Sequence, residues 1–338
     1  MPDSLQNALD QALQNRQPLL ASLHAEHTDA YRLFHGSAEN HPGLTVDRYG
    51  PLLLIQTFHQ SLDHSQREQI EAFYADALPG LHAIYNDRSR SHSRVSNPLP
   101  EAQRGIADTR YQFSELGLRY HIQARHAGQD PWLFLDLRAG RRHIRQTVAE
   151  QSVLNLFAYT CGVGLAAAAG GAAHVVNVDF AESSLRIGKD NARLNDLAIR
   201  PRFIQSDAFA AMRQLAGIGQ ADRVRGKRMP PFPALAARQF DLVFLDPPRY
   251  AKSAFGVVDL INDYPALLKP AIGCTRPGGR LICCNNVAQV SRNDWEAQLL
   301  RSAEKNGRPV QSLHWITPES DFPSHDDQHP LKMVELVL

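Results

Sequence analysis

The sequence is poor in cysteine and carries no sign of a metal site built from it. Cys161, Cys274, Cys283 and Cys284 are the four cysteines in 338 residues, and they lack the paired spacing of zinc ligands. All four fall in segments that we expect to be buried core, so we predict free thiols. The polar run 325–329 holds metal-binding residue types but has no third spaced ligand, which favours a polar loop without a metal.

Long apolar runs are absent as well. No stretch of about 18 apolar residues occurs, and no basic start is followed by an apolar segment. The sequence therefore predicts neither a membrane span nor a secretion signal, and we expect a cytoplasmic protein.

Charge of one sign is equally scarce. Lys and Arg number 36 against 35 Asp and Glu, a net charge of +1 that argues against a uniformly basic nucleic-acid binder. Arginines still outnumber nearby acids between residues 88 and 145, which is enough for local phosphate contact. The chain is longer than one typical domain and 43% hydrophobic, so we expect a soluble enzyme of two globular parts.

The most informative stretch present is 153–164. Its apolar residues 153–157 are typical of a strand buried on both faces, and an Ala-rich helix is expected to open at 165–169. Between them, Gly162 and Gly164 are expected to let the backbone turn sharply beside a ligand. This pattern predicts a bound nucleotide-like cofactor.

The same glycines leave two cofactor classes open. Gly162, Gly164 and Ala167 satisfy the dinucleotide fingerprint, and Asp179 follows the next apolar strand, so an NAD-dependent oxidoreductase is an alternative. Downstream, however, a second buried strand at 240–245 ends in Asp-Pro-Pro, which is typical of methyl transfer.

Four further segments carry a more specific resemblance to a known family. They are Tyr-Arg-Leu-Phe at 31–34, Pro-Gly-Leu-Thr-Val-Asp-Arg-Tyr at 42–49, Phe-Leu-Asp-Leu-Arg at 134–138 and Phe-Ala-Tyr-Thr at 157–160. With these segments the chain resembles the class I S-adenosylmethionine (SAM) methyltransferases, and within them the bacterial large-subunit ribosomal RNA methyltransferases of the RlmI and RlmK type. The resemblance covers nearly the whole chain.

The resemblance implies an α/β fold, a Rossmann-like SAM methyltransferase sheet with a smaller α+β N-terminal domain. We expect a helical segment at 1–33, a small α+β RNA-presenting domain at 34–126 and the methyltransferase domain at 127–338. RlmI-type members begin with a PUA RNA-binding domain, whereas only about one helix is expected before Tyr31, so RNA contact should come from elsewhere. The expected partner is ribosomal RNA of the large subunit or its precursor, and the oligomeric state is open.

Alternation of strand and helix places the remaining elements. Core strands are expected at 153–157, 175–179, 203–207, 240–246 and 279–285. Upstream, Ser65 and Glu68 have the form of a capping box that starts a helix, and 111–122 has the pattern of a hairpin that turns near Gly117. A basic loop at 223–233 is expected to touch RNA or to be solvated.

Acids at the ends of three core strands should line one cleft, because ligands collect at the carboxyl ends of parallel strands. Asp179 would accept hydrogen bonds from the ribose hydroxyls of SAM, with Phe180 against the adenine and Asp207 at its amino group. The alternative is that these acids cap the following helices. The cofactor-binding residues predicted are Arg138, Asn155, Phe157, Tyr159, Thr160, Gly162, Asp179, Phe180, Asp207, Ala208 and Asp246.

The target base is expected at Asp246, Pro247 and Pro248, because prolines fix the backbone so that the carboxylate and carbonyls face the site. Methyl transfer is an in-line displacement, so alignment supplies much of the acceleration and no covalent intermediate is required. The alternative is an ordinary Pro-Pro loop, with Arg249, Tyr250 and Lys252 as a solvated rim.

The acceptor atom depends on residues 278–286. In the cytosine-C5 members of the family, a cysteine here supplies a thiolate that attacks C6. Aligned from the paired glycines, that cysteine falls on Asn286, and Cys283 and Cys284 precede it by three and two residues. A cytosine-C5 enzyme that uses Cys283 or Cys284 is therefore disfavoured but remains an alternative.

Guanine N7 is the preferred acceptor. Residues 285–286, Asn-Asn, resemble the Ser-Asn-Asn of the guanine-N7 member, and Asp321-Phe322 with His329 resemble its Asp-Phe and downstream His. N7 has a free lone pair, so orienting the base suffices, and Asn286 is the catalytic candidate for that task. Guanine N2 methylation and an inactive RNA-binding module are the further alternatives.

Overall fold

The computed structural model describes residues 5–91, 98–219, 223–224, 227–229, 231–253, 256–261, 263–326 and 328–338. Contacts divide the chain into one unit of Met1–Asp136 with Glu319–Asp327, and another of Leu137–Pro318 with Gln328–Leu338. The chain thus passes between the units three times. The division at 33/34 and 126/127 stays a prediction, whereas the contact-defined boundary follows Asp136.

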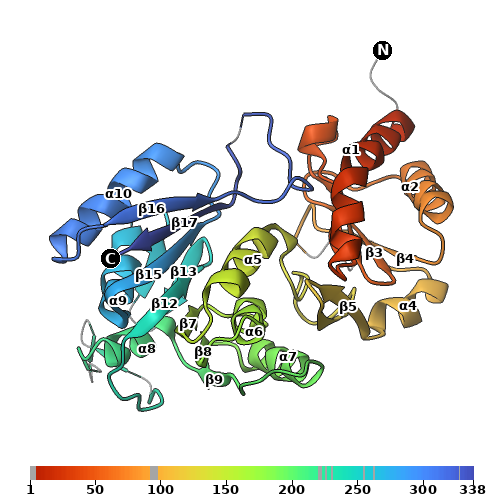
Figure 1. Ribbon diagram of the computed structural model, residues 1–338. Helices are drawn as coiled ribbons and strands as arrows, with labels where there is room; N and C mark the ends of the chain where they lie inside the picture. The colour runs from red at the N-terminus through yellow and green to blue at the C-terminus, as the bar shows by residue number, and fades with distance from the viewer. Residues whose placement is uncertain are drawn as a thin grey trace. The chain divides into compact units, whose positions relative to one another are not determined.

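The first unit is built on a four-stranded sheet in the order β1-β2-β3-β4 (Figure 1). Its elements are α1 (Leu5–Ala25), β1 (Ala30–Phe34), η1 (Ser37–Glu39), β2 (Leu44–Tyr49), β3 (Leu52–Thr57), α2 (His64–Ala77), β4 (His82–Asp87), α4 (Glu101–Asp108), β5 (Tyr111–Glu115) and β6 (Leu118–Ile122). The first helix buries Leu9, Leu20 and Leu23 in the same core as Tyr31 and Val46 of the sheet. The predicted N-terminal helix is confirmed over Leu5–Ala25, where it shares a core with the strands, whereas residues 30–33 of the predicted helical segment belong to β1.

Two local predictions in this unit have different outcomes. The helix α2 begins two residues earlier than expected, because Asp63 is its N-cap and accepts from the Gln66 N–H (2.8 Å) while Gln66 accepts from the Asp63 N–H (3.1 Å). The capping box at Ser65 was therefore wrong. The hairpin is confirmed: β5 and β6 pair around Leu116 and Gly117, which both have the positive φ that a tight hairpin turn requires.

The second unit is a seven-stranded sheet in the order β16-β17-β15-β12-β7-β8-β9. Its elements are η2 (Leu135–Leu137, which leads in), α5 (Arg138–Thr147), β7 (Ser152–Leu156), α6 (Gly162–Ala169), β8 (His174–Asp179), α7 (Glu182–Arg193), β9 (Arg202–Gln205), α8 (Ala208–Leu215), β10 (Arg223–Val224), β11 (Lys227–Arg228), β12 (Phe240–Leu245), β13 (Tyr250–Ser253), β14 (Gly256–Asp259), α9 (Tyr264–Cys274), β15 (Thr275–Asn285), α10 (Arg292–Lys305), β16 (Ser312–Ile316) and β17 (Lys332–Val337). The five predicted core strands are confirmed and are parallel.

Two strands of the seven-stranded sheet were not predicted. Strands β16 and β17 run antiparallel to each other, and β17 runs antiparallel to β15. Strand β16 alternates polar and apolar residues, and β17 is interrupted by Lys332 and Glu335, so neither forms the continuous apolar run that marks a strand buried on both faces.

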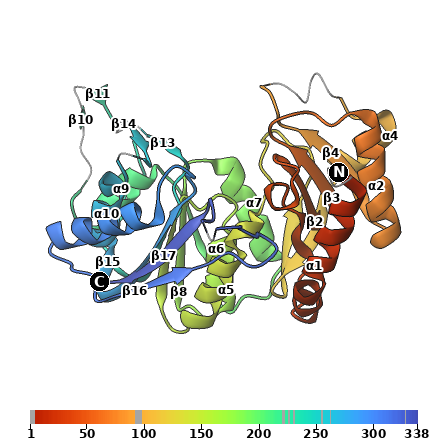
Figure 2. The ribbon, with the colours of Figure 1, turned by 90° about the horizontal axis from the view of Figure 1, so that it is seen from above.

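Helices cover both faces of this sheet, which confirms the α/β Rossmann-like class. Figure 2 shows α9 and α10 on one side and α5 and α6 on the other. Along β15 the side chains alternate accordingly: Leu281 and Cys283 enter the core under α8, α9 and α10, whereas Ile282 and Cys284 enter the core under α5 and α6. Among the described residues, no helix combines the length and apolar character needed to cross a membrane.

Candidate active site

The switch point of the sheet lies between β7 and β12. These strands are paired in register, with Leu156 beside Leu245, while β8 and β9 extend the sheet on one side and β15 on the other. In open α/β sheets ligands bind at the carboxyl ends of the strands at such a point. Phe157 and Asp246, which directly follow the two leucines, therefore begin neighbouring loops at the expected site.

The turn after β7 holds an unusual backbone. Phe157, Tyr159 and Cys161 have φ of 55°, 48° and 66°, in the left-handed region that residues with a side chain rarely adopt. Such residues persist where the surroundings over-determine them, often at ligand sites. The prediction that Gly162 and Gly164 make this turn was wrong, because both lie in α6.

Hydrogen bonds from β8 fix this turn. The Ala158 N–H donates to the Val178 carbonyl (3.0 Å), and the Tyr159 N–H donates to Asp179 Oδ2 (2.7 Å). On the other side Cys161 packs against α7, where a Cβ at Gly188 would lie 2.6 Å from the Cys161 sulfur. The strained turn is thus held from two elements.

Gly164 serves close packing. A Cβ there would lie 2.0 Å from Asn177 Oδ1, the atom that accepts from Asn155 Nδ2 (2.9 Å). Asn155, predicted to bind cofactor, is buried and pairs with Asn177 in the sheet. This amide pair therefore sets the distance between α6 and β8.

Asp179 is the best-anchored acid of the site. Its carboxylate accepts from the Tyr159 N–H and, through Oδ1, from the Ala181 N–H (2.8 Å). Burial raises the pKa of Asp179, while the N–H groups of Ala181 and Tyr159 lower it. A carboxylate has about four lone-pair positions, so each oxygen can still accept a bond from a ribose hydroxyl.

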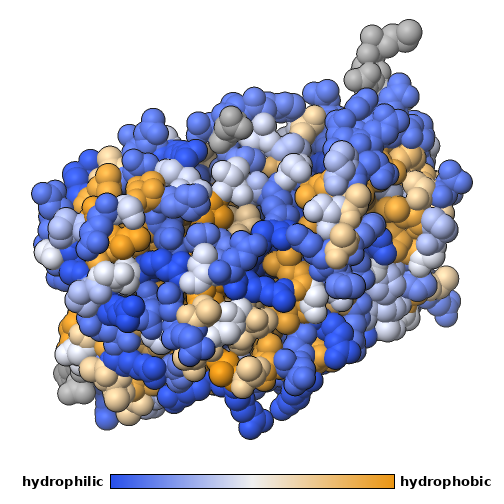
Figure 3. Space-filling model, viewed as in Figure 1, coloured by the Kyte–Doolittle hydropathy of each residue, from blue (hydrophilic) through white to orange (hydrophobic). Residues whose placement is uncertain are grey.

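Phe180, next along the chain, is 70% exposed, a high value for a large hydrophobic side chain. The face of the molecule in Figure 3 is mostly hydrophilic with small, separate hydrophobic areas, as expected of a water-exposed surface. An aromatic ring open beside an anchored carboxylate fits an adenosine group, which offers a flat base and two ribose hydroxyls.

Asp207 caps the following helix, which was the alternative interpretation of the acids at the strand ends. Its Oδ1 accepts from the N–H groups of Phe209 (2.8 Å) and Ala210 (3.2 Å), so it is the N-cap of α8, and Ala208 begins that helix. The predicted adenine contact of Asp207 stays a prediction.

The Asp-Pro-Pro segment follows β12, with Asp246 half-buried, Pro247 buried and Pro248 exposed. Tyr264 of α9, which no sequence pattern predicted, lies close enough to interact with the Asp246 carboxylate. Its hydroxyl donates to the Cys284 carbonyl (3.0 Å), and burial raises its pKa, with the thiols of Cys283 and Cys284 and the Asp246 carboxylate adding to the shift. No local sequence pattern marks a tyrosine that acts through a strand 20 residues away.

The end of β15 turns sharply at residues 285–287. Asn285 is fully buried, and its Oδ1 accepts from the Val287 N–H (2.9 Å), whereas its Nδ2 has no partner among the described residues. Asn286, the predicted base-orienting residue, is exposed. Lys332, also missed, donates from Nζ to the carbonyls of Val287 and Pro330, both at 3.0 Å.

The four cysteines are buried free thiols, as predicted. Burial raises the pKa of Cys283 to about 12, while its hydrogen bond with Tyr264 lowers it. Because the thiolate is the nucleophilic form, a thiol with this pKa is almost entirely protonated at neutral pH. Cys283 and Cys284 point into opposite cores, so neither is presented at the site.

Several other predicted residues fall elsewhere. Arg138 is fully buried at the start of α5, and Thr160 is buried in the turn after β7. Arg249 is exposed, whereas the side chains of Tyr250 and Lys252 lie outside the described residues. Residues 225, 226 and 230 of the 223–233 loop also lie outside them.

Asp321 and Phe322 belong to the first unit. Asp321 Oδ2 accepts from the Arg32 N–H (3.0 Å), and the Arg32 guanidinium lies 4.5 Å from the centre of the Phe322 ring. Arg32 also donates to both oxygens of Asp47 (2.8 and 2.9 Å). Arg32 of segment 31–34 thus contacts two further segments that carried the family resemblance, 42–49 and 321–322. His329 lies in the second unit and is half-buried.

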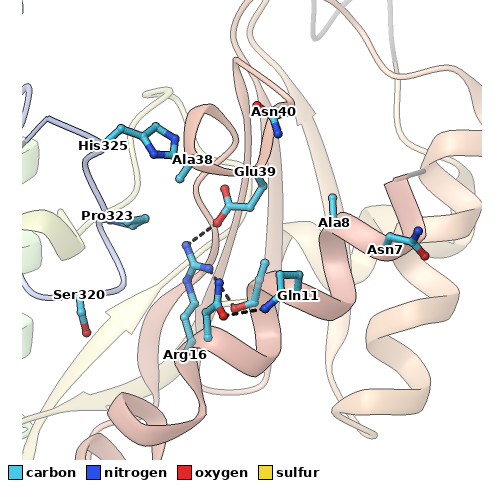
Figure 4. Close-up of a pocket in the computed structure, with 12 residues that line it drawn as sticks. Asn7, Ala8, Gln11, Arg16, Ala38, Glu39, Asn40, Ser320, Pro323 and His325 are labelled. Carbon is cyan, nitrogen blue, oxygen red and sulfur yellow. Dashed lines mark hydrogen bonds and ion pairs between the residues drawn. The ribbon is translucent and has the colours of Figure 1, made fainter. Parts of the chain in front are cut away.

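The first unit also holds a pocket of about 360 Å³ (Figure 4). Two of its lining residues, Arg16 and Glu39, form an ion pair of 2.8 Å. The lining residues are Asn7, Ala8, Gln11, Ala12, Asn15, Arg16, Ala38, Glu39, Asn40, Ser320, Pro323 and His325. None of the predicted site residues is among them.

A family model described as S-adenosylmethionine-dependent methyltransferase matches residues 31–337. The chain belongs to this methyltransferase family. A "Ribosomal RNA large subunit methyltransferase" of Deinococcus radiodurans is 30% identical over 323 residues, 93% of this chain and 74% of that relative. A "Ribosomal RNA large subunit methyltransferase I" of Salmonella arizonae is 27% identical over 303 residues, 87% of this chain and 69% of the relative.

Solved structures agree on the fold. A SAM-dependent methyltransferase from Streptococcus mutans superposes with a TM-score of 0.75 at 21% identity, covering 98% of this chain and 80% of its own. A methyltransferase complexed with SAH gives a TM-score of 0.76 at 22% identity with the same coverage. The predicted enzyme class and the predicted cofactor, SAM, are confirmed by the family, and the NAD-dependent and inactive alternatives lose their support.

Proposed function

We propose that this methyltransferase modifies large-subunit ribosomal RNA and that the accepting atom is N7 of a guanine. The RNA class is supported by the relatives, since a protein named for this substrate aligns with 93% of the chain. The base must leave its stack to reach a methyl donor, so locally opened RNA is the expected substrate.

The observation that carries the choice of base is the burial of Cys283 and Cys284. Cytosine C5 becomes nucleophilic only after a thiolate adds to C6. Both thiols are fully buried, and the pKa of Cys283 is raised to about 12, so this chain offers no such thiolate at the end of β15. Guanine N7 requires neither a covalent adduct nor a base, because its lone pair is already available.

In the proposed mechanism the chain binds and orients. Asp179 accepts from the ribose hydroxyls, and Phe180 and Asp207 flank the adenine. SAM would supply the methyl group from a positively charged sulfonium, and its sulfur would leave as a neutral thioether. Asp246 and the Pro247 and Pro248 carbonyls hold the base from one side, and the exposed Asn286 amide orients it from the other. Alignment of N7 with the methyl group then gives most of the acceleration.

The test is direct identification of the product. Purified protein is incubated with methyl-labelled SAM and ribosomal RNA from a strain that lacks it, and the RNA is digested to nucleosides. Labelled 7-methylguanosine is the expected result, and Asp246→Ala should lower turnover by about a hundredfold or more while sparing most SAM binding. Label in 5-methylcytidine would overturn the base assignment, N2-methylguanosine would make Asp246 a proton acceptor, and an unlabelled RNA would reject the substrate.

A further inference from the structure

The turn that presents Asn286 is held at Val287 by two side chains and by one backbone hydrogen bond. Both polar backbone groups of Val287 are bound: its N–H donates to Asn285 Oδ1 (2.9 Å), and its carbonyl accepts from Lys332 Nζ (3.0 Å) and from the Val290 N–H (3.1 Å). Val287 itself is buried in the core. Asn286, between these fixed neighbours, is the exposed residue of the turn.

Lys332 reaches the turn from the adjacent strand. It begins β17 and pairs in register with Asn285 on β15. Because β15 also pairs with β12, with Cys283 beside Leu245, the 285–287 turn follows next to the loop that carries Asp246. The Lys332 ammonium thus lies at the same end of the sheet as the Asp-Pro-Pro segment.

Burying a lysine at this position costs free energy, because its ammonium group loses contact with water. Lys332 is 8% exposed, burial lowers its pKa, and it forms no ion pair with any residue that the structure describes. Its contacts are the carbonyls of Val287 and Pro330. A well-packed apolar residue at a buried charged site is often as good or better for stability. Stability alone therefore does not account for a cation here.

We propose that Lys332 is a positioning residue of the methyl-transfer reaction, which with Asn285 fixes the turn that presents Asn286 to the target base. This inference rests on the proposed role of Asn286. Lys332 acts on the backbone of Val287, and its effect reaches the base through Asn286. A displaced orienting group lowers the rate of a reaction that depends on alignment, even when the cofactor binds normally.

The experiment compares Lys332→Met, Lys332→Arg and the matched control Lys305→Met, which removes an exposed lysine on α10. Single-turnover methyl transfer is measured at saturating SAM and RNA, with SAM affinity and thermal unfolding recorded for each variant. Lys332→Met should slow transfer by roughly ten- to a hundredfold with SAM affinity within about twofold of the parent. Lys332→Arg, which keeps charged donors, should recover a large part of the rate, and Lys305→Met should match the parent.

A double-mutant cycle with Asn286→Ala separates positioning from folding. If Lys332 acts through Asn286, Lys332→Met should slow transfer little further once the Asn286 side chain is gone, and Asn285→Ala should behave in the same way. A full rate in Lys332→Met, or independent effects of the two changes, would overturn the proposal. Should Lys332→Met unfold, Asn285→Ala reports on the same turn.

Failure of this proposal differs from failure of the proposed function. The rates are measured on whichever nucleoside the parent enzyme labels, so a product other than 7-methylguanosine changes the base assignment and leaves the test of Lys332 intact. Coupled variants on any labelled base support the positioning role, and uncoupled variants refute it.

Discussion

The core of the first unit and the strand ends of the second unit hold charged side chains in different ways. In the first unit Arg32 binds Asp47 and Arg16 binds Glu39, so charged side chains pair with one another. In the second unit, at the carboxyl ends of the strands, polar side chains bind the backbone of turns: Asp179 holds Tyr159, and Lys332 holds Val287. Closed networks stabilise a scaffold, whereas side chains that clamp a turn fix the position of the residue it presents.

The largest expected effect tests the scaffold side of this contrast. Asp47 is 2% exposed and receives two hydrogen bonds from Arg32, so Asp47→Asn leaves a mostly buried guanidinium without its counter-charge. The free energy of unfolding should fall by about 3–5 kcal/mol, with SAM affinity unchanged. Denaturant unfolding and calorimetry measure the two quantities, and the exposed Asp108→Asn is the control. Weaker SAM binding by the folded Asp47→Asn protein would break the contrast.

For Asp179 the expected main effect is on SAM affinity. Asp179→Ala removes both the acceptor of the Tyr159 N–H and the proposed ribose contact, so SAM affinity should fall by about a hundredfold, since each bond to a charged group contributes roughly 1.5–3 kcal/mol. Titration calorimetry measures the affinity, with the exposed Asp196→Ala as control. Unchanged affinity would remove the ribose contact from the proposal.

The contrast also explains what the sequence could predict. The core strands and the acids at their ends were predictable, because strands buried on both faces are continuous apolar runs and the acids stand directly after them. Lys332 and Tyr264 were not, since they act on backbone groups 45 and 20 residues away, and periodicity contains no information on such pairs. Likewise, Arg32 and Asp321 are 289 residues apart. Gly164 was assigned to the ligand because its neighbour Asn177 cannot be read from local spacing.

A pair of glycine substitutions compares close packing in the two units. Gly164→Ala places a methyl group 2.0 Å from Asn177 Oδ1 and should lower the free energy of unfolding by about 1–3 kcal/mol, because α6 must move or the Asn155–Asn177 bond must break. Gly105→Ala, inside α4, meets nothing within 4 Å and should raise it by about 0.5–1 kcal/mol. Chemical denaturation measures the free energy of unfolding of both variants. Equal changes in the two variants would show that α6 is not closely packed against Asn177.

The smallest effect sharpens the contrast within one strand, because β12 has an acid near each end. Asp241, near its start, accepts from the Ser152 N–H and hydroxyl (both 2.6 Å) and pairs with Arg276, as the acids of the first unit pair with their neighbours. Burial raises the pKa of Asp241, but the Ser152 hydrogen bonds and the Arg276 charge outweigh it, so the pKa is lower in the folded protein.

The sign of the pH effect follows from this shift. A carboxyl whose pKa is lower in the folded protein contributes stability above its unfolded pKa of about 3.9, and loses it as the pH falls through the folded value. Asp241→Asn should therefore lower the free energy of unfolding at pH 7 by about 1 kcal/mol or less. The difference in unfolding free energy between the variant and the parent should become smaller below about pH 4. Thermal unfolding from pH 7 to pH 3 measures this. A difference that does not narrow between pH 7 and pH 3, or a loss of methyl transfer at pH 7, would show that Asp241 does more than pair with its neighbours.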